Sequence, residues 1–362
     1  MADQAVGTPK PPSTPAAGGT TLTAKDFLSD QEVRWCPGCG DYAILSAVTS
    51  IFPKIGVARE NIVVVSGIGC SSRFPYYTNT FGFHGIHGRA PAIATGLKTM
   101  RRELSVWVVT GDGDGLSIGG NHLIHTMRRN VDLKILLFNN KIYGLTKGQA
   151  SPTSEMGKRT ASSPLGTYER PFNTLSLALG AEATFVARSV DVYRAHLQET
   201  LMRAAAHRGT AFIEIYQNCN IFNDGAFDDV IEPTVRDDRN LLLRHGQPLV
   251  YGKEPRKGIR RNPETGMLEV VELGNGIAEK DLVVHDERRP DPDLAFELSR
   301  LCWPLFPTPI GVFRSVQAPT SEDLVWKQVE DAKVAKPNAG LDSLLRRGDL
   351  WRVTEDGKVE QL

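Results

Sequence analysis

Cysteines and a glycine–aspartate turn are the residues of this chain whose types and spacing could do chemistry. The stretch "VRWCPGCGDY" places Cys36 and Cys39 three positions apart in a tight Pro-Gly turn, and Cys70 and Cys219 each follow an apolar run. If those two runs are neighbouring parallel strands, their thiols emerge at one edge of a sheet, and the CxxC turn can fold over that edge. Four thiolates gathered there suit an iron–sulfur cluster or a zinc ion.

The spacing of these cysteines favours a cluster over zinc. Zinc sites with four cysteines usually pair two CxxC knuckles, whereas this chain has one CxxC and two single cysteines on separate strands. A cluster built into the fold is therefore the first interpretation, and zinc or unrelated buried cysteines are the alternatives. The fifth cysteine, Cys302 in "LCWPLF", is predicted to be buried and inert.

The second stretch, "VVTGDGDGLSIGG" at residues 108–120, predicts a phosphate site. Glycines let the backbone approach a ligand, and a helix expected to begin near Ser117 aims its free N–H groups at the same place. Asp112 would repel a phosphate unless a divalent cation lay between them, which indicates Mg²⁺. Asn139 and Asn140, at the end of the next apolar run, offer further oxygen ligands. The alternative is a glycine-rich turn with solvated aspartates.

A parallel sheet is the structure that would bring these residues together. Short apolar runs alternate with longer amphipathic segments, and runs that are apolar on both faces need helices on both sides. The predicted fold class is therefore α/β, with a doubly wound, mostly parallel sheet. The strands are expected at 61–67, 104–111, 133–140, 181–187 and 210–217, and the helices at 41–52, 88–102, 118–130, 171–180 and 191–208.

Composition limits the classes of protein to which the chain can belong. Its 362 residues carry 42 basic and 42 acidic side chains, so the balance favours neither a nucleic-acid nor a membrane partner. No apolar stretch approaches the ~18 residues of a membrane span. Residues 1–24 lack the features of a signal peptide and are predicted to be a disordered leader, so we expect a cytoplasmic protein.

The chain is expected to divide into a core and an extension. The α/β domain is placed at residues 25–228, and residues 229–362 are predicted to form an irregular extension that packs on the core or on a partner subunit. Within that extension, residues 246–273 indicate a pair of exposed strands around "NPETG", a turn-forming cluster.

The spacing of "GDG" and "NN" resembles the thiamine diphosphate-binding motif of thiamine-dependent enzymes. The resemblance implies that Asp112, Asn140 and the backbone carbonyl of Ile142 hold Mg²⁺. It also implies that Gly113 and Asp114 lie against the diphosphate.

Both motifs together resemble the β subunit of the 2-oxoacid:ferredoxin oxidoreductases, and most closely the branch that uses 2-oxoglutarate. The resemblance covers residues 33–225 and implies a [4Fe–4S] cluster on Cys36, Cys39, Cys70 and Cys219. The matching stretches are "WCPGCGDY", "GIGCSSR", "FHGIHGRAPAIATGLK", "GDGDGLSIGGNHLIHTMRRN", "NNKIYGLTKGQASPTS", "NTLSLALGAEATFVAR" and "YQNCNIFND".

The activity that this resemblance implies is oxidative decarboxylation of 2-oxoglutarate with coenzyme A, giving succinyl-CoA and CO₂ and passing electrons to ferredoxin. Pyruvate or a broad range of 2-oxoacids is the alternative substrate. Thiamine enzymes also need a carboxylate, normally Glu, against the aminopyrimidine ring. Because the chain has one doubly wound core, an α subunit is expected to supply that Glu, and we expect an assembly of two αβ units.

Further site residues follow from the same resemblance. Arg73, Lys147 and Leu145 are expected beside the substrate, where an arginine could grip a carboxylate with two hydrogen bonds. The cofactor is expected to contact a second set: His87, Ile68, Gly69 and Gly111. The remaining closely spaced histidines are interpreted as structural: His84, His122 and His125.

Two other classes of protein stay open at this point. One is a non-catalytic iron–sulfur electron carrier that has lost thiamine diphosphate. The other is a thiamine-dependent decarboxylase or synthase without redox chemistry.

Overall fold

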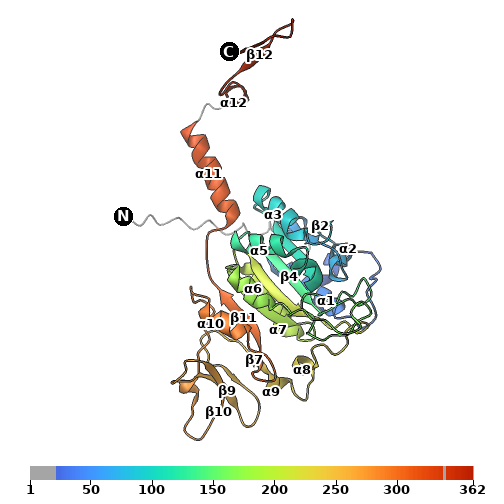
Figure 1. Cartoon of the computed structure of the whole chain (residues 1–362), viewed down its shortest axis with the longest axis vertical. Coiled ribbons are helices and arrows are strands. Elements are labelled where there is room, and N and C mark those ends of the chain that lie inside the picture. The colour runs from blue at the N-terminus through green and yellow to red at the C-terminus, as the bar shows by residue number, and fades with distance from the viewer. Residues whose placement is uncertain (1–21, 337–339, 362) are drawn as a thin grey trace.

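A mixed eight-stranded sheet forms the centre of the computed structural model, which describes residues 22–336 and 340–361 (Figure 1). Its strand order is β2-β1-β3-β4-β6-β5-β11-β7, and the first six strands in that order are parallel. The strands are β1 (Ile62–Ser66), β2 (Phe81–His84), β3 (Ser105–Gly111), β4 (Leu133–Asn139), β5 (Phe185–Val190), β6 (Ala211–Tyr216), β7 (Asn240–Leu242) and β11 (Thr308–Ser315).

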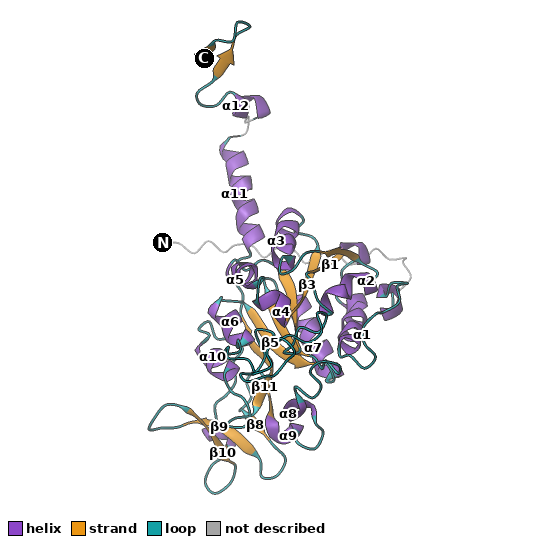
Figure 2. Cartoon of the chain, turned by 45° about the vertical axis from the view of Figure 1, so that its right-hand side comes forward, coloured by secondary structure: helices purple, strands orange, loops and turns teal. Residues whose placement is uncertain are grey.

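Helices cover both faces of this sheet, which confirms the predicted doubly wound fold (Figure 2). Alternate residues of each strand enter opposite cores: Val108 lies in one and Val109 in the other. One face carries α3 (Ala90–Met100), α5 (Gly120–Arg128), α6 (Thr174–Gly180) and α10 (Asp293–Ser299), and the other carries α1 (Asp41–Ile51), α2 (Phe74–Tyr77) and α7 (Arg194–Ala206).

Strand β5 begins four residues later than predicted. Residues 181–184 form the turn that ends α6: Ala181 is the C-cap of the helix, and Glu182 adopts a positive φ of 60°. The apolar run in this segment therefore serves first to end a helix and only then to form a strand. Of the leader predicted at 1–24, residues 1–21 lie outside the described part, and Ala24 opens a short 3₁₀ helix that ends at Phe27.

The C-terminal extension is more regular than predicted, because β11 and β7 join the central sheet. Strand β11 is antiparallel to β5, and β7 is parallel to β11. A second, three-stranded sheet contains β8 (Val250–Tyr251), β9 (Lys257–Arg261) and β10 (Leu268–Glu272). Strands β9 and β10 are antiparallel on either side of "NPETG", which confirms the predicted strand pair.

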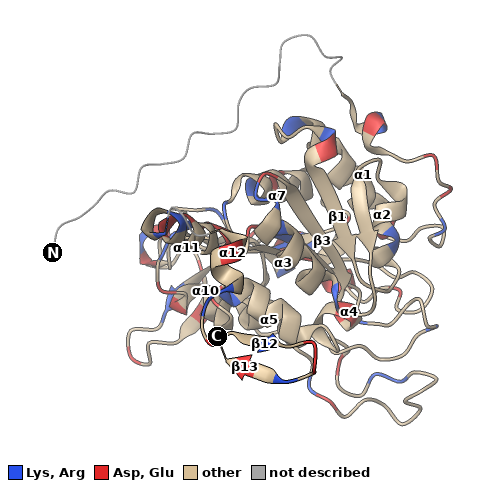
Figure 3. Ribbon diagram, turned by 90° about the horizontal axis from the view of Figure 1, so that it is seen from above, with Lys and Arg blue, Asp and Glu red and all other residues tan. Residues whose placement is uncertain are grey.

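The last segments leave the body of the molecule as an arm (Figures 1 and 2). They are α11 (Ser321–Ala335), α12 (Leu341–Leu345), β12 (Trp351–Val353) and β13 (Val359–Gln361). Two shorter helices, α8 (Asp228–Ile231) and α9 (Arg236–Arg239), are not part of this arm and precede the second sheet in the chain. Within the described ranges, no helix is both long and apolar enough to cross a membrane. Basic and acidic side chains are interspersed along the ribbon (Figure 3).

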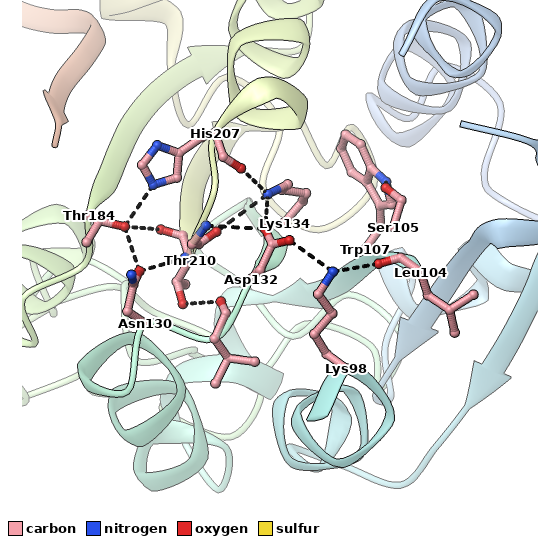
Figure 4. Close-up of polar contacts among 12 residues, drawn as sticks. Lys98, Leu104, Ser105, Trp107, Asn130, Asp132, Lys134, Thr184, His207 and Thr210 are labelled. Carbon is pink, nitrogen blue, oxygen red and sulfur yellow. Dashed lines mark hydrogen bonds and ion pairs between the residues drawn. The ribbon is translucent and has the colours of Figure 1, made fainter. Parts of the chain in front are cut away.

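A buried ion-pair network closes the amino edge of the sheet (Figure 4). Asp132, just before β4, binds the ammonium groups of Lys98 at 2.9 Å and Lys134 at 2.6 Å. Although burial opposes ionisation, these two ammonium groups hold the pKa of Asp132 well below its usual range. The backbone N–H of Asp132 also donates to Glu322 at the start of α11, so the arm is anchored at this edge.

We expect Asp132→Asn to destabilise the chain by about 3–5 kcal/mol, because it leaves two buried ammonium groups without their anion. Urea unfolding at pH 7 measures this loss. Since the pKa of Asp132 is depressed, its contribution is complete above about pH 4 and is lost as the pH falls further. Asp331→Asn, which breaks only the exposed pair with Lys327, is the matched control and should change nothing measurable.

Candidate functional site

The predicted site residues meet at the carboxyl edge of the sheet. Strands β1, β3, β4 and β6 are consecutive neighbours there, and the chain order reverses between β1 and β3, where open α/β sheets bind ligands. A pocket at this edge is lined by Ile68, Gly69, Cys70, His87, Gly111, Asp112, Gly113, Asp114, Asn140, Ile142 and Leu145, together with seven residues that were not predicted.

Asp112 and Asn140 both line this pocket, as the magnesium prediction requires. Asp112 is buried, and its Oδ2 accepts hydrogen bonds from Ser151 at 2.6 Å and Thr153 at 2.5 Å, whereas no described residue donates to its Oδ1. Burial raises the pKa of Asp112 to about 6, although the two hydroxyl groups oppose this shift. Asn140 donates to Gln217 at 2.8 Å. The pocket therefore contains a buried carboxylate with no cationic partner.

Asn139 points elsewhere. Its Nδ2 donates to Glu214 at 2.7 Å, and its Oδ1 accepts from Thr153 at 2.9 Å. Glu214 is in turn paired with Arg188 at 2.7 Å inside the sheet. Of the two adjacent asparagines, only Asn140 lines the pocket, and its Oδ1 there accepts from the backbone N–H of Ile142 at 3.2 Å.

Asp114 lines the pocket and is held by four hydrogen bonds. Its Oδ1 accepts from the backbone N–H of Ile68 at 3.1 Å, from His87 Nδ1 at 2.6 Å and from the N–H of Gly88 at 2.7 Å, and its Oδ2 accepts from Thr110 at 2.6 Å. A carboxylate with four donors has little capacity left for a ligand. It ties together the loops that follow β1 and β2 while lining the pocket, and its position against a diphosphate stays a prediction.

The helix expected to begin near Ser117 is α5, which begins at Gly120, three residues later. The short helix α4 (Asp112–Leu116) starts within the glycine–aspartate motif itself, directly after β3 (Figure 3). Gly113 must be glycine, because a Cβ there would lie 2.2 Å from the ring of Tyr143, whose hydroxyl donates to the Gly113 carbonyl at 3.0 Å. Tyr143 also packs edge-on against His87.

Cys70, Cys219 and Cys39 lie beside this pocket, and Cys36 is near enough to Cys70 to help raise its pKa. A Cβ at Gly144 would lie 3.5 Å from Cys70 Sγ and 3.6 Å from Cys219 Sγ, so both sulfur atoms face the same small space. The CxxC turn folds over them: the indole of Trp35 donates to the Cys70 carbonyl at 2.7 Å, and Gln217 donates to Cys39 Sγ at 3.3 Å. The edge predicted from the strand ends is therefore the edge that these thiols share.

The four thiols differ in how deeply they are buried. Burial raises the pKa of Cys70 to about 12, with the carboxylate of Asp41 adding to the shift, and burial also raises the pKa of Cys39. Cys36 is exposed. Throughout the described part of the chain, no three His, Cys, Asp or Glu side chains are close enough together to hold a single metal ion.

Cys302 is exposed, and the prediction that it is buried was wrong. The stretch "LCWPLF" is apolar in composition but forms a turn beyond α10, where Trp303 and Leu305 are exposed as well. An apolar run indicates burial only when an element packs it against the core, and this run lies in a turn on the surface.

The predicted substrate residues are only partly brought together. Leu145 lines the pocket, whereas Arg73 and Lys147 do not. Arg73 follows Cys70 by one 3₁₀ turn, and Lys147 is exposed on the turn beyond Leu145 with a positive φ of 78°. Neither cation has an ion-pair partner in the described ranges, so both remain available to an anion.

Of the other closely spaced histidines, His84 has hydrogen-bond contacts on its ring, whereas the buried Nδ1 of His125 has none among the described residues. His84 Nδ1 contacts the Ser72 carbonyl at 2.8 Å and Ser66 Oγ at 3.2 Å. His122 and His125 lie on α5 and do not line the pocket.

Asp41 and Gln217 are pocket residues that were not predicted. Asp41 is buried, both of its carboxylate oxygens lack a hydrogen-bond partner, and burial raises its pKa to about 7. Gln217 bridges Asn140 and Cys39, and so connects the two halves of the site. The available signal was position alone, since Asp41 lies two residues after Cys39 and Gln217 lies two residues before Cys219.

The pocket is small in the chain by itself. Its volume is ≈ 90 Å³, below the roughly 300–1,000 Å³ of ordinary ligand pockets. A larger cavity of ≈ 1030 Å³ lies elsewhere, with none of these residues in its lining. We place the candidate site at the smaller pocket, because the thiols, the buried carboxylates and the glycine-rich turn converge there.

Comparison with known proteins identifies similar chains. Residues 67–215 match the family described as "Thiamine pyrophosphate enzyme, C-terminal TPP binding domain". The chain is 55% identical over 332 residues to the 2-oxoglutarate oxidoreductase subunit KorB of Mycobacterium tuberculosis, covering 91% of this chain and 88% of that protein. It is 46% identical over 190 residues to the 2-oxoacid:ferredoxin oxidoreductase 1 subunit beta of Aeropyrum pernix, covering 52% of this chain and 60% of the relative.

A solved structure is similar over nearly its whole length. It is the 2-oxoglutarate:ferredoxin oxidoreductase from Magnetococcus marinus with 2-oxoglutarate, coenzyme A and succinyl-CoA bound. The TM-score is 0.67 at 31% sequence identity, covering 88% of this chain and 97% of that one.

Replacing Asp112 by Asn should stabilise the cofactor-free chain at pH 8 by on the order of 1–3 kcal/mol, because the buried charge is removed. The sign follows from the raised pKa: the burial cost is present above about pH 6 and disappears below about pH 4, where the carboxyl is protonated in both states. Thermal unfolding at pH 8 and pH 4 measures the difference.

Asp114→Asn is the matched control for this prediction. The new asparagine would place an NH₂ group against the donors that Asp114 now accepts from, so the substitution should lower the free energy of unfolding by about 1–3 kcal/mol. Equal effects of the two substitutions would contradict the roles assigned to the two carboxylates.

Proposed function

Because the chain belongs to the β subunits of the 2-oxoacid:ferredoxin oxidoreductases, we propose that it is the thiamine diphosphate-binding β subunit of a 2-oxoglutarate:ferredoxin oxidoreductase. The complete enzyme converts 2-oxoglutarate and coenzyme A to succinyl-CoA and CO₂, and it transfers two electrons to ferredoxin in single steps. The observation that carries the proposal is the convergence of the four thiols with the Asp112 turn at one sheet edge, in a chain 55% identical to a 2-oxoglutarate oxidoreductase subunit.

The pocket residues fit thiamine diphosphate with Mg²⁺. Asp112 offers a buried carboxylate, Asn140 offers an amide oxygen and Ile142 a backbone carbonyl, which are the hard oxygen ligands that Mg²⁺ prefers. When bound, thiamine diphosphate supplies the carbanion that attacks the 2-oxoacid carbonyl. The protein orients this group through Asp114, which fixes the surrounding loops, and through Gly113 and Tyr143, which shape the wall of the pocket.

The same residues point to a [4Fe–4S] cluster rather than zinc. Zinc sites with four cysteines usually pair two CxxC knuckles, whereas this chain has one CxxC and two single cysteines. A cluster tolerates wider spacing, since each Cys binds a different iron. Cys70 lines the cofactor pocket and Cys36 is exposed, so the four ligands extend from the site of chemistry to the surface where an electron acceptor can approach.

The small pocket supports the need for a second subunit. Its lining includes no glutamate, and an α subunit is proposed to supply the Glu that faces the aminopyrimidine ring. The turn that carries Leu145 and Lys147 is exposed and lies beside the pocket. Arg73 and Lys147 are the cations proposed to hold the two carboxylates of 2-oxoglutarate. We further propose an assembly of two αβ units in the cytoplasm.

Activity should require both subunits. We expect the α–β complex, purified anaerobically, to reduce viologen with 2-oxoglutarate and coenzyme A at least about tenfold faster than with pyruvate or branched 2-oxoacids. The isolated chain should be inactive with all of them. Robust turnover by the isolated chain, or a complex that prefers pyruvate, would contradict this function.

Cluster binding should depend on four of the five cysteines. Cys39→Ser is expected to abolish the dithionite-bleachable visible absorbance and the viologen activity of the complex, because a hydroxyl is a poor substitute for a thiolate ligand. Cys302→Ser is the matched control, since that thiol is exposed and lies away from the pocket. Bound iron and sulfide, measured chemically, give the same answer without an activity assay. Iron retained in the first variant would argue against the ligand set.

A further inference from the structure

A second cavity, of ≈ 1030 Å³, lies between the core and the C-terminal extension. Its walls come from the first turn of α7, from α9 and β7, and from the second sheet, and it shares no lining residue with the thiamine pocket. Ligand pockets favour such junctions and typically measure roughly 300–1,000 Å³. The cavity is therefore large enough for a cofactor-sized molecule, and the proposed function leaves it unused.

The lining of this cavity carries more cations than anions. Four arginines contribute to it, whereas its two carboxylates are already engaged: Glu279 pairs with Arg256 at 3.0 Å, and Asp237 pairs with Lys253 at 3.0 Å. Arg194 and Arg244 form no ion pair with any described residue. These two guanidinium groups are exposed, and Arg244 also lines the adjoining cavity on the far side of His196.

The first turn of α7 adds a second source of positive potential. No side chain caps this 13-residue helix, and its first turn contains no acidic residue. The N–H groups of its first residues point out of the helix end, where an anion is stabilised by the helix dipole. Arg194 is the first residue of α7, so its guanidinium and these N–H groups belong to the same end of the cavity.

Asn240, a buried residue of the lining, has a side-chain oxygen that lacks a hydrogen-bond donor. Asn240 is 7% exposed and its Oδ1 has no partner, whereas its Nδ2 donates to the Tyr193 hydroxyl at 2.9 Å and the Val230 carbonyl at 2.7 Å. A phosphate or polyphosphate dianion cannot supply that donor, but a ribose hydroxyl or a base amino group can. Tyr193 and Tyr251 line the same cavity and offer aromatic faces for a planar ring.

We propose that this cavity binds a nucleotide. Its phosphates lie against Arg194, Arg244 and the N-terminus of α7, and its nucleoside lies toward Asn240 and the two tyrosines. The volume, the surplus of arginine and the unpartnered acceptor together fit a molecule that is anionic at one end and carries donors and an aromatic ring at the other.

Isothermal titration of the purified α–β complex with ATP, ADP, AMP, inorganic triphosphate and coenzyme A tests this site. We expect at least one nucleotide to bind, and the double variant Arg194→Ala, Arg244→Ala to weaken that binding by about tenfold or more. Asn240→Ala should weaken nucleotide binding and leave triphosphate binding unchanged. Arg128→Ala, an exposed arginine on α5 away from the cavity, is the matched control and should bind like the parent protein.

Several outcomes would overturn the site. They are no binding of any nucleotide at millimolar concentration, binding that survives the double variant, binding of coenzyme A alone, and binding by the isolated chain that is lost in the complex, which would show that the α subunit fills the cavity. Melting temperatures of the variants verify that they fold. Oxidation of 2-oxoglutarate, measured in the same preparations, separates failure of this site from failure of the proposed function.

Discussion

The carboxylate of Asp114 is the interaction on which the carboxyl edge of the sheet depends. It accepts hydrogen bonds from the loop after β1, from the loop after β2 and from the end of β3, and it is buried among them. Asp112, two residues earlier on the same helical turn, instead faces the pocket with one oxygen free of protein donors. One turn of α4 therefore separates two tasks: a satisfied carboxylate fixes the loops, and an unsatisfied one remains for a cation.

The two edges of the sheet differ in whether their buried polar groups have partners. At the amino edge, Asp132, Lys98 and Lys134 satisfy one another, and Glu322 of α11 closes the network from the C-terminal side. At the carboxyl edge, both carboxylate oxygens of the buried Asp41 lack a partner. Stability is concentrated where polar groups are paired, and chemistry where they are not, because an unpaired buried group gains most from a ligand.

The C-terminal extension contributes two strands to the central sheet as well as segments on the surface. Strands β11 and β7 complete the central sheet beyond β5, and the segments between them form the wall of the arginine-lined cavity. The extension thereby creates a second concave site at its junction with the core. Only its last part, from α11 onward, extends away from the body.

The sequence by itself determined the doubly wound core and the edge at which its chemistry lies, because strand periodicity and the residues that follow each strand are local properties. Cys70, Cys219 and Asp112 could be placed together for that reason. Only the tertiary structure decided that Asp114 faces inward, that Asp41 and Gln217 enter the pocket, that β11 pairs with β5, and that Cys302 is exposed. These features depend on contacts between residues far apart in the chain, and no local pattern of residues encodes which side chain will meet which partner.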